Sequence, residues 1–130
     1  MIFLDTDACI SFFQGSKELQ IVIEKFKEPI AITSPTIFEV KCGINYFEKK
    51  YKKNEDPILL QKFKLFKIFN FGEQAAINAS EIWADLKING RMIKIMDILI
   101  GSIILTNNSK NIISNDEHFK NIQGLNVINY

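Results

Sequence analysis

Residues Met1-Ile-Phe-Leu-Asp5 place four apolar side chains in a row and close them with a carboxylate. A run that is apolar at every position is typical of a central parallel strand, because helices cover both faces of such a strand. In parallel α/β sheets, ligands bind outside the carboxyl ends of the strands. The stretch therefore predicts a buried strand that carries Asp5 to the ligand-binding edge of a sheet.

Segments with strand character alternate with segments of helical periodicity along the rest of the chain. The further predicted strands are Ile30–Thr33, Lys67–Phe71, Asn111–Ser114 and Asn126–Ile128. The predicted helices are about Asp7–Phe13, one capped by Ser16 and ended before Pro29, one from Ser34, one from Pro57, one between Gly72 and Gly90, Lys94–Leu105 and Glu117–Asn121. This alternation favours βαβ units and a parallel sheet.

Local patterns predict the helix ends and the core. Ser34 is the expected N-cap of its helix, with Pro35 as the first helical residue. Trp83 is expected to anchor its helix, and Lys49–Asp56 to lead from a helix end into an exposed loop. Spacings of three and four mark the expected core positions. They include Leu19, Val22, Ile23 and Phe26; Ile37, Val40, Ile44 and Phe47; Leu60, Phe63 and Leu65 or Phe66; and Ala75, Ala79, Ile82 and Leu86.

Composition bounds the class of protein. At 130 residues, with 47% hydrophobic and 24% charged residues, the chain fits one globular domain spanning residues 1–130. The formal net charge of +1 excludes the strongly basic signature of proteins that coat nucleic acid. Cys9 and Cys42 are the only cysteines and His118 the only histidine, so no Cys/His zinc set can form. Both cysteines are expected to be small buried groups.

No segment predicts a secretory leader or a membrane span. The first residues lack a basic region, and their apolar run stops at Asp5. The longest strongly apolar stretch, Ile98–Leu105, is far below the roughly 20 residues that cross a bilayer. We therefore expect a cytoplasmic protein with reduced thiols and no membrane partner.

Four acidic residues stand at predicted strand ends or near predicted helix starts. They are Asp5, Glu39, Asp97 and Asp116. Taken alone, Asp5 or Asp116 is better explained as a helix cap or turn residue. Together, the four carboxylates would repel one another at one rim of the sheet unless a cation offsets their charge. Because hard divalent ions prefer all-oxygen sites, the joint occurrence predicts a metal site.

Four short motifs stand in the order and spacing of a known family. They are Leu4-Asp-Thr6, Ser34-Pro-Thr-Ile-Phe-Glu39, Asp97-Ile-Leu-Ile-Gly101 and Ser114-Asn-Asp-Glu-His-Phe119. With these motifs the chain resembles PIN-domain ribonucleases from Ile2 to about Ile128, and among them the VapC-type toxins of toxin-antitoxin pairs. Each motif alone is weak, and their joint register carries the resemblance.

The resemblance implies a PIN-like three-layer α/β/α fold around a central parallel sheet of four or five strands. It implies an endoribonuclease that holds Mg²⁺ or Mn²⁺ at Asp5, Glu39, Asp97 and Asp116, with the hydroxyl of Ser114 positioning this group. It also implies an RNA substrate, a homodimer, and a cognate antitoxin that inserts a segment into the active-site groove.

The chemistry of phosphodiester hydrolysis suggests a role for each of the four acids. Mg²⁺ takes one or two direct carboxylates and keeps several waters, one of which becomes more acidic. We expect Asp5 and Asp97 to be the direct ligands. Glu39 would align water or accept a proton, and Asp116 would act in an outer position or on a second ion.

Basic and aromatic side chains offer surface for RNA, because such groups contact phosphates and stack on bases. They are Lys49, Lys50, Lys52, Lys53, Lys87, Arg91 and Lys94, with Tyr46, Phe47 and Tyr51. A lysine run is more often a solvated face, so this pattern is not specific.

Three features depart from the family pattern. Asp7 stands where Asn or Ser is common, and it either adds a fifth acid near the site or caps the first helix. The segment Arg91–Met96 lacks the small and proline residues usual before the third acid, and Gly101 replaces an alanine. Because the four acids are retained, these changes bear on substrate choice more than on catalysis.

Three other functions fit parts of the sequence. A phosphoreceiver domain has a similar acidic pocket, but Asp56 follows a lysine-rich loop and the late strand-end lysine is missing. A haloacid-dehalogenase-type phosphatase shares the pair of acids in Asp5-Thr-Asp7, but Ala8 and Cys9 replace its usual Gly and Thr. A non-catalytic PIN-like module that binds RNA or protein is the third, and retention of all four acids argues against it.

Overall fold

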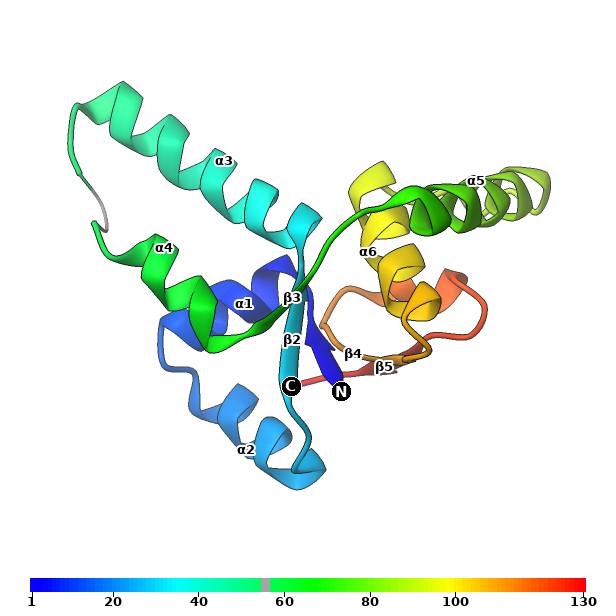
Figure 1. The fold of residues 1–130 in the computed structure, drawn as a ribbon, viewed down its shortest axis with the longest axis horizontal. Helices are drawn as coiled ribbons and strands as arrows, with labels where there is room; N and C mark the ends of the chain where they lie inside the picture. The colour runs from blue at the N-terminus through cyan, green and yellow to red at the C-terminus, as the bar shows by residue number, and fades with distance from the viewer. Residues whose placement is uncertain (55–56) are drawn as a thin grey trace.

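A five-stranded parallel sheet forms the centre of the computed structural model, which describes residues 1–54 and 57–130 (Figure 1). In sheet order the strands are β3 (Lys67–Phe69), β2 (Ile30–Thr33), β1 (Ile2–Leu4), β4 (Asn111–Ile113) and β5 (Asn126–Ile128). Every neighbouring pair is parallel. The chain moves outward from β1 to β3 and then returns to β4 on the other side, so the strand order reverses between β1 and β4.

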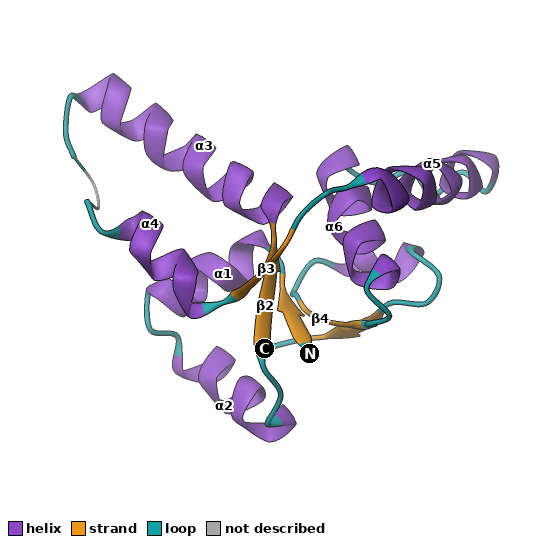
Figure 2. Cartoon of the chain, in the orientation of Figure 1, coloured by secondary structure: helices purple, strands orange, loops and turns teal. Residues whose placement is uncertain are grey.

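Helices cover both faces of the sheet (Figure 2), which confirms the predicted three-layer arrangement. They are α1 (Thr6–Phe13), α2 (Lys17–Phe26), α3 (Ser34–Tyr51), α4 (Leu59–Lys62), α5 (Glu73–Ile88) and α6 (Ile95–Thr106), with the 3-10 helices η1 (Phe63–Leu65) and η2 (Glu117–Asn121). The helices α1 to α4 pack on one face, and α5, α6 and η2 pack on the other. Within the two described ranges, no helix combines the length and the apolar character needed to cross a membrane.

The side chains of β1 divide between the two cores. Ile2 and Leu4 pack with α1 to α4, whereas Phe3 packs with α5 and α6, and all three are fully buried. Successive side chains of a strand point to opposite faces, so a strand covered on both sides needs an apolar residue at every position. Each burial stabilises the fold by about 1.5–3 kcal/mol.

The start of α3 lies one residue earlier than predicted. Thr33, not Ser34, is the N-cap, and its hydroxyl accepts a hydrogen bond from the Thr36 amide at 3.3 Å. The hydroxyl of Ser34 accepts instead from the Phe71 amide at 3.1 Å. The prediction was wrong because Thr33, the last residue of β2, has the extended backbone that an N-cap also needs.

Some side chains predicted to anchor a helix or to be buried lie at the surface. Trp83 is 40% exposed, and the Lys87 ammonium lies over its ring at 5.0 Å from the centre. Phe47 and Cys42 are exposed on the part of α3 that projects from the sheet (Figure 1). Periodicity defines an apolar face, but it does not show whether another element covers that face.

The segment around α4 buries part of the predicted set. Phe63 and Phe66 are buried as predicted, whereas Leu60 faces solvent and its neighbour Leu59 is buried instead. The helix is a single turn that tightens into η1, which shifts the inward-facing positions. The next strand, β3, ends at Phe69 rather than two residues later. Asp56, at the end of the predicted loop after α3, lies outside the described residues.

Gly101 lets the segment after η2 approach α6 closely. A Cβ atom at this position would lie 2.6 Å from Ile122 Cδ1 and 3.2 Å from Leu125 Cδ1. Both distances are shorter than ordinary van der Waals contact. The departure from alanine at this position therefore matches the local packing.

We predict that Gly101→Val lowers the free energy of unfolding by about 1–3 kcal/mol, because the added methyl groups overpack against Ile122 and Leu125. Gly43→Val is the matched control, since Gly43 is also helical and a Cβ there would meet nothing within 4 Å. Urea denaturation measures both variants. Equal stabilities of the two would contradict this packing argument.

Candidate metal centre

Asp5, at the end of β1, is 4% exposed and is held through both of its carboxylate oxygens. Oδ1 accepts a hydrogen bond from the Ala8 amide at 2.7 Å, which makes Asp5 the N-cap of α1. Oδ2 accepts from the hydroxyl of Ser114, a buried residue directly after β4. Of the two alternatives for Asp7, a fifth acid near the site or the helix cap, the second is wrong, because Asp5 is the N-cap and Asp7 lies exposed in the first turn of α1. The Asp5–Ser114 pair lies where the strand order reverses, the usual place for ligands.

Glu39 reaches the same region from α3. Thr6, the residue after Asp5, donates a hydrogen bond from Oγ1 to Glu39 Oε1 at 2.5 Å. The bond is partly buried, and it joins the first turn of α1 to α3. A single hydroxyl therefore holds Glu39 beside the end of β1.

Asp97 lies in the first turn of α6 and is 7% exposed. Its Oδ2 atom is buried, and it has no hydrogen-bond partner among the described residues. Burial of a polar atom without a partner is costly, and such atoms are rare in folded proteins. Asp97 Oδ2 therefore needs a partner that the described chain does not provide.

Asp116 joins the group from the loop after β4. Its amide donates to Ser114 Oγ at 2.9 Å, so the hydroxyl of Ser114 links Asp116 to Asp5. Asp116 Oδ1 accepts from the His118 amide at 2.9 Å, and it lies 3.0 Å from His118 Nδ1. Asp116 is thus also the N-cap of η2.

The charge state of Asp97 depends on the other three acids. Burial is the largest cause that raises the pKa of Asp97 from its ordinary value of 3.8 to about 6. The charges of Asp116, Glu39 and Asp5 raise this pKa further, and the Lys94 ammonium lowers it. The other three predicted acids are therefore near enough to act on Asp97.

Asp5 shows the same behaviour. Burial raises its pKa from 3.8 to about 6, against the opposing effect of hydrogen bonds from Ser114 and Ala8. The neighbouring charges of Asp7 and Asp116 also raise the pKa. Two buried acids at one edge thus resist ionisation at a pH where exposed carboxylates are charged.

These donors fit a hard divalent cation. In residues 1–54 and 57–130, no three acid, histidine or cysteine side chains form a compact ligand set. Like charges keep carboxylates apart without a cation, and Mg²⁺ needs only one or two direct carboxylates. The unpartnered Asp97 Oδ2 and the raised pKa values of Asp5 and Asp97 are the features that fit such an ion.

All five residues predicted for the site are brought to one edge of the sheet, and their roles remain predictions. They are Asp5, Glu39, Asp97, Ser114 and Asp116. Thr6 was not predicted to contact the site, although a hydroxyl directly after the first acid is a visible signal in the sequence. The contact of His118 with Asp116 was not predicted either.

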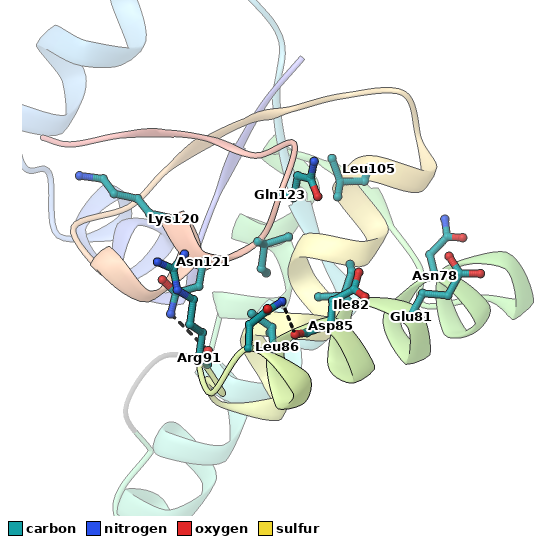
Figure 3. A pocket seen from close by; sticks show the side chains of 12 residues that line it. Asn78, Glu81, Ile82, Asp85, Leu86, Arg91, Leu105, Lys120, Asn121 and Gln123 are labelled. Carbon is teal, nitrogen blue, oxygen red and sulfur yellow. Dashed lines mark hydrogen bonds between the residues drawn. The ribbon is translucent and has the colours of Figure 1, made fainter.

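A cavity of about 1060 Å³ lies elsewhere, between α5 and residues 120–123 (Figure 3). Its polar lining includes Asn78, Glu81, Asp85, Arg91, Lys120 and Gln123. None of the four acids of the candidate site lines it. Because the volume of a cavity does not by itself indicate chemistry, we place the candidate metal centre at the acids and not in this cavity.

Comparisons with known proteins match this arrangement. A family model described as PIN domain matches residues 2–125. A relative named Ribonuclease VapC3, from Methanocaldococcus jannaschii, is 32% identical over 100 residues, which cover 77% of this chain and 94% of the relative.

Two solved structures share the fold over nearly the whole chain. One is VapBC2 from Rickettsia felis bound to a DNA fragment from their promoter, with a TM-score of 0.82, 24% identity, and coverage of 100% of this chain and 99% of that chain. The other is DNA-bound VapBC from Salmonella typhimurium, with a TM-score of 0.79, 19% identity, and coverage of 99% and 98%. At these identities the two structures support the fold alone.

We predict that the metal-free protein loses stability as pH rises from about 4 to above 6. The unfolded chain releases the Asp97 proton near 3.8, whereas the folded chain keeps it until about 6, so ionisation above that range costs stability. In EDTA, Asp97→Asn should therefore exceed the wild type by about 1–2 kcal/mol at pH 8, and this gain should shrink towards pH 4.

Denaturant unfolding at several pH values measures this difference. Asp85→Asn, at an exposed acid of α5, is the control and should show no comparable pH-dependent gain. A constant difference between Asp97→Asn and the wild type from pH 4 to pH 8 would count against the acid cluster.

Proposed function

The chain belongs to the PIN-domain family, and we propose that it is an endoribonuclease that hydrolyses RNA phosphodiester bonds with Mg²⁺ or Mn²⁺. The observation that carries this proposal is the buried Oδ2 of Asp97, which has no partner in the described chain and lies near three other acids. The relative named a ribonuclease supports RNA as the substrate class.

Asp5 and Asp97 are the proposed direct ligands, because they are the two buried acids of the group. Asp97 offers its Oδ2 atom, which has no hydrogen-bond partner among the described residues. Asp5 accepts one hydrogen bond at each oxygen, and each oxygen keeps a further lone pair. A divalent ion held by these residues would supply an acidic water and offset the charge that develops on the phosphate.

Glu39 and Asp116 complete the proposed site. Thr6 fixes Glu39 Oε1, which leaves Oε2 to orient a water or accept its proton. The amide and ring of His118 fix Asp116 Oδ1, which leaves Oδ2 for an outer position or a second ion. The hydroxyl of Ser114 keeps Asp5 and Asp116 in position relative to each other, because it contacts both Asp5 and the backbone of Asp116.

Lys94 is the proposed contact for the phosphate nearest the acids. It is the N-cap residue of α6, it is exposed, and its charge acts on Asp97. An ammonium beside a carboxylate cluster attracts the phosphate that the carboxylates alone would repel. The lysines and aromatic rings of α3 would extend the contact along the RNA.

We extend the proposal to a toxin-antitoxin pair. The relative is a VapC ribonuclease, and the two structural neighbours are VapBC proteins. On this basis the chain would be the toxin, act in the cytoplasm, form a homodimer and bind a cognate antitoxin. Genes encoded next to this chain would test the pairing directly.

The alternatives from other classes have less support. The family match favours neither a phosphoreceiver nor a haloacid-dehalogenase-type phosphatase. Asp56, the residue considered as the phosphate acceptor of a receiver domain, lies outside the described residues. The non-catalytic PIN-like module differs from the proposed enzyme only in turnover, so an assay of RNA cleavage separates the two.

We predict that Asp5→Asn and Asp97→Asn each reduce Mn²⁺-dependent cleavage of structured RNA at least about 100-fold, because each removes a direct ligand. Gel analysis of cleavage with Mn²⁺ and with EDTA measures the effect, and circular dichroism checks the fold. Asp85→Asn, outside the acid group, should cleave like the wild type. Wild-type turnover by either site variant removes that residue from the mechanism.

A further inference from the structure

Residues 128–130 lie beside the loop that carries Ser114 and Asp116. The strand β4 ends at Ile113, which pairs with Ile128, the last residue of β5. The Ser114 amide donates to the Ile128 carbonyl at 2.9 Å and so continues this pairing into the loop. Asn129 Nδ2 then donates to the Ser114 carbonyl at 3.0 Å. The two backbone polar groups of Ser114 are thus held by the last residue of β5 and by the residue after it.

The next residue of the loop is held in the same manner. Asn115 Nδ2 donates to the Tyr130 carbonyl at 3.0 Å, and Asn115 Oδ1 accepts from the Tyr130 amide at 3.0 Å. The side chain of Asn115 therefore takes the place of a neighbouring strand for the backbone of Tyr130. Two bonds that share one planar amide fix its orientation better than one bond would.

Tyr130 also connects this loop to α1. Its hydroxyl lies 3.1 Å from the hydroxyl of Ser11, and its ring packs against the core that includes Ile2, Leu4 and Ala8. The first turn of α1 contains Thr6, and its N-cap is Asp5. One segment thus contacts both of the elements that carry the ends of the Asp5–Ser114 bond.

We infer that Asn115, Asn129 and Tyr130 form a clasp that sets the geometry of the metal centre by positioning the Ser114–Asp116 loop. They are positioning residues, because none of them belongs to the acid group itself. The inference rests on the proposed function for its link to metal binding. It adds a second set of residues on which the affinity for the ion depends.

Ser114 is the reason why small shifts of this loop matter. Its hydroxyl donates to Asp5 Oδ2 and accepts from the Asp116 amide, so a displaced Ser114 moves both acids. Metal sites need ligands held within about 0.5 Å of the productive geometry. Partners behind the ligands typically change metal affinity 10- to 100-fold when they are removed.

The same bonds could serve only to strengthen the edge of the sheet, and the chain offers a matched control for that role. Asn126 Nδ2 donates to Asn111 Oδ1 at 2.9 Å, at the opposite end of the same two strands. Asn126 and Asn129 are both exposed, and each bridges β5 to the β4 segment. Only Asn129 lies at the end where the acids gather.

The test compares Asn115→Ala, Asn129→Ala and Tyr130→Phe with the control Asn126→Ala. Mn²⁺ alone is the probe, and calorimetric titration without RNA measures its dissociation constant. We expect binding to weaken about 10-fold or more in Asn115→Ala and Asn129→Ala, and by a smaller factor above twofold in Tyr130→Phe. Asn126→Ala should stay within about twofold of the wild type. RNA cleavage by the weakened variants should recover at high Mn²⁺.

Amide hydrogen exchange in EDTA gives a second readout that needs no ion. The Asp116 amide should exchange about 10-fold faster in Asn129→Ala than in the wild type, and at the wild-type rate in Asn126→Ala. If Asn115→Ala does not fold, Asn129→Ala and Tyr130→Phe still provide both measurements.

The outcomes separate this inference from the proposed function. A wild type that binds no Mn²⁺ contradicts the proposed function. The exchange rates of the Asp116 amide then still test whether the clasp positions the loop. Wild-type exchange of the Asp116 amide in Asn129→Ala would overturn the clasp. So would Mn²⁺ affinities of Asn115→Ala and Asn129→Ala equal to that of Asn126→Ala.

Discussion

Asp5 and Asp97 are buried at one edge of the sheet, and the charge of Asp5 acts against the ionisation of Asp97. Hydroxyls and amides supply part of the compensation, since Ser114 and Ala8 hold Asp5. Asp97 keeps one oxygen with no partner in the described chain, and Lys94 is the cation that acts on it. A fold that gathers negative charge in this way loses stability unless a positive ion offsets it. The proposed nuclease chemistry follows from that requirement.

The topology explains why these acids meet although they are far apart in sequence. The central strand β1 ends in Asp5 and lies between β2 and β4. The strand β2 leads directly into α3, which carries Glu39, and β4 leads into Ser114 and Asp116. Parallel strands deliver their carboxyl ends to one edge, so three chain segments contribute ligands without any long loop. The helix α6 adds Asp97 from the face that covers Phe3.

The strands and the acids could be read from sequence because each follows from local chemistry. The apolar run of β1 indicates that helices cover both faces of the strand. The four carboxylates follow apolar runs or stand near helix starts. Exposure was harder to predict: Leu60 and Phe47 have the spacing of core positions, but both side chains lie at the surface. The bonds of Thr6 and Asn115 were missed because they depend on which segments become neighbours. Amide and hydroxyl side chains follow no sequence periodicity from which their hydrogen-bond partners could be predicted.

Diffraction from a crystal soaked in Mn²⁺ is the sharpest test of the proposed metal site, because anomalous scattering locates the ion itself. We predict a peak between the carboxylates of Asp5 and Asp97, with oxygens at about 2.0–2.6 Å. Glu39 and Asp116 should lie around it, directly or through water. A protein saturated with Mn²⁺ that shows no peak at this edge, or a peak away from both buried acids, would show that these carboxylates do not hold the ion.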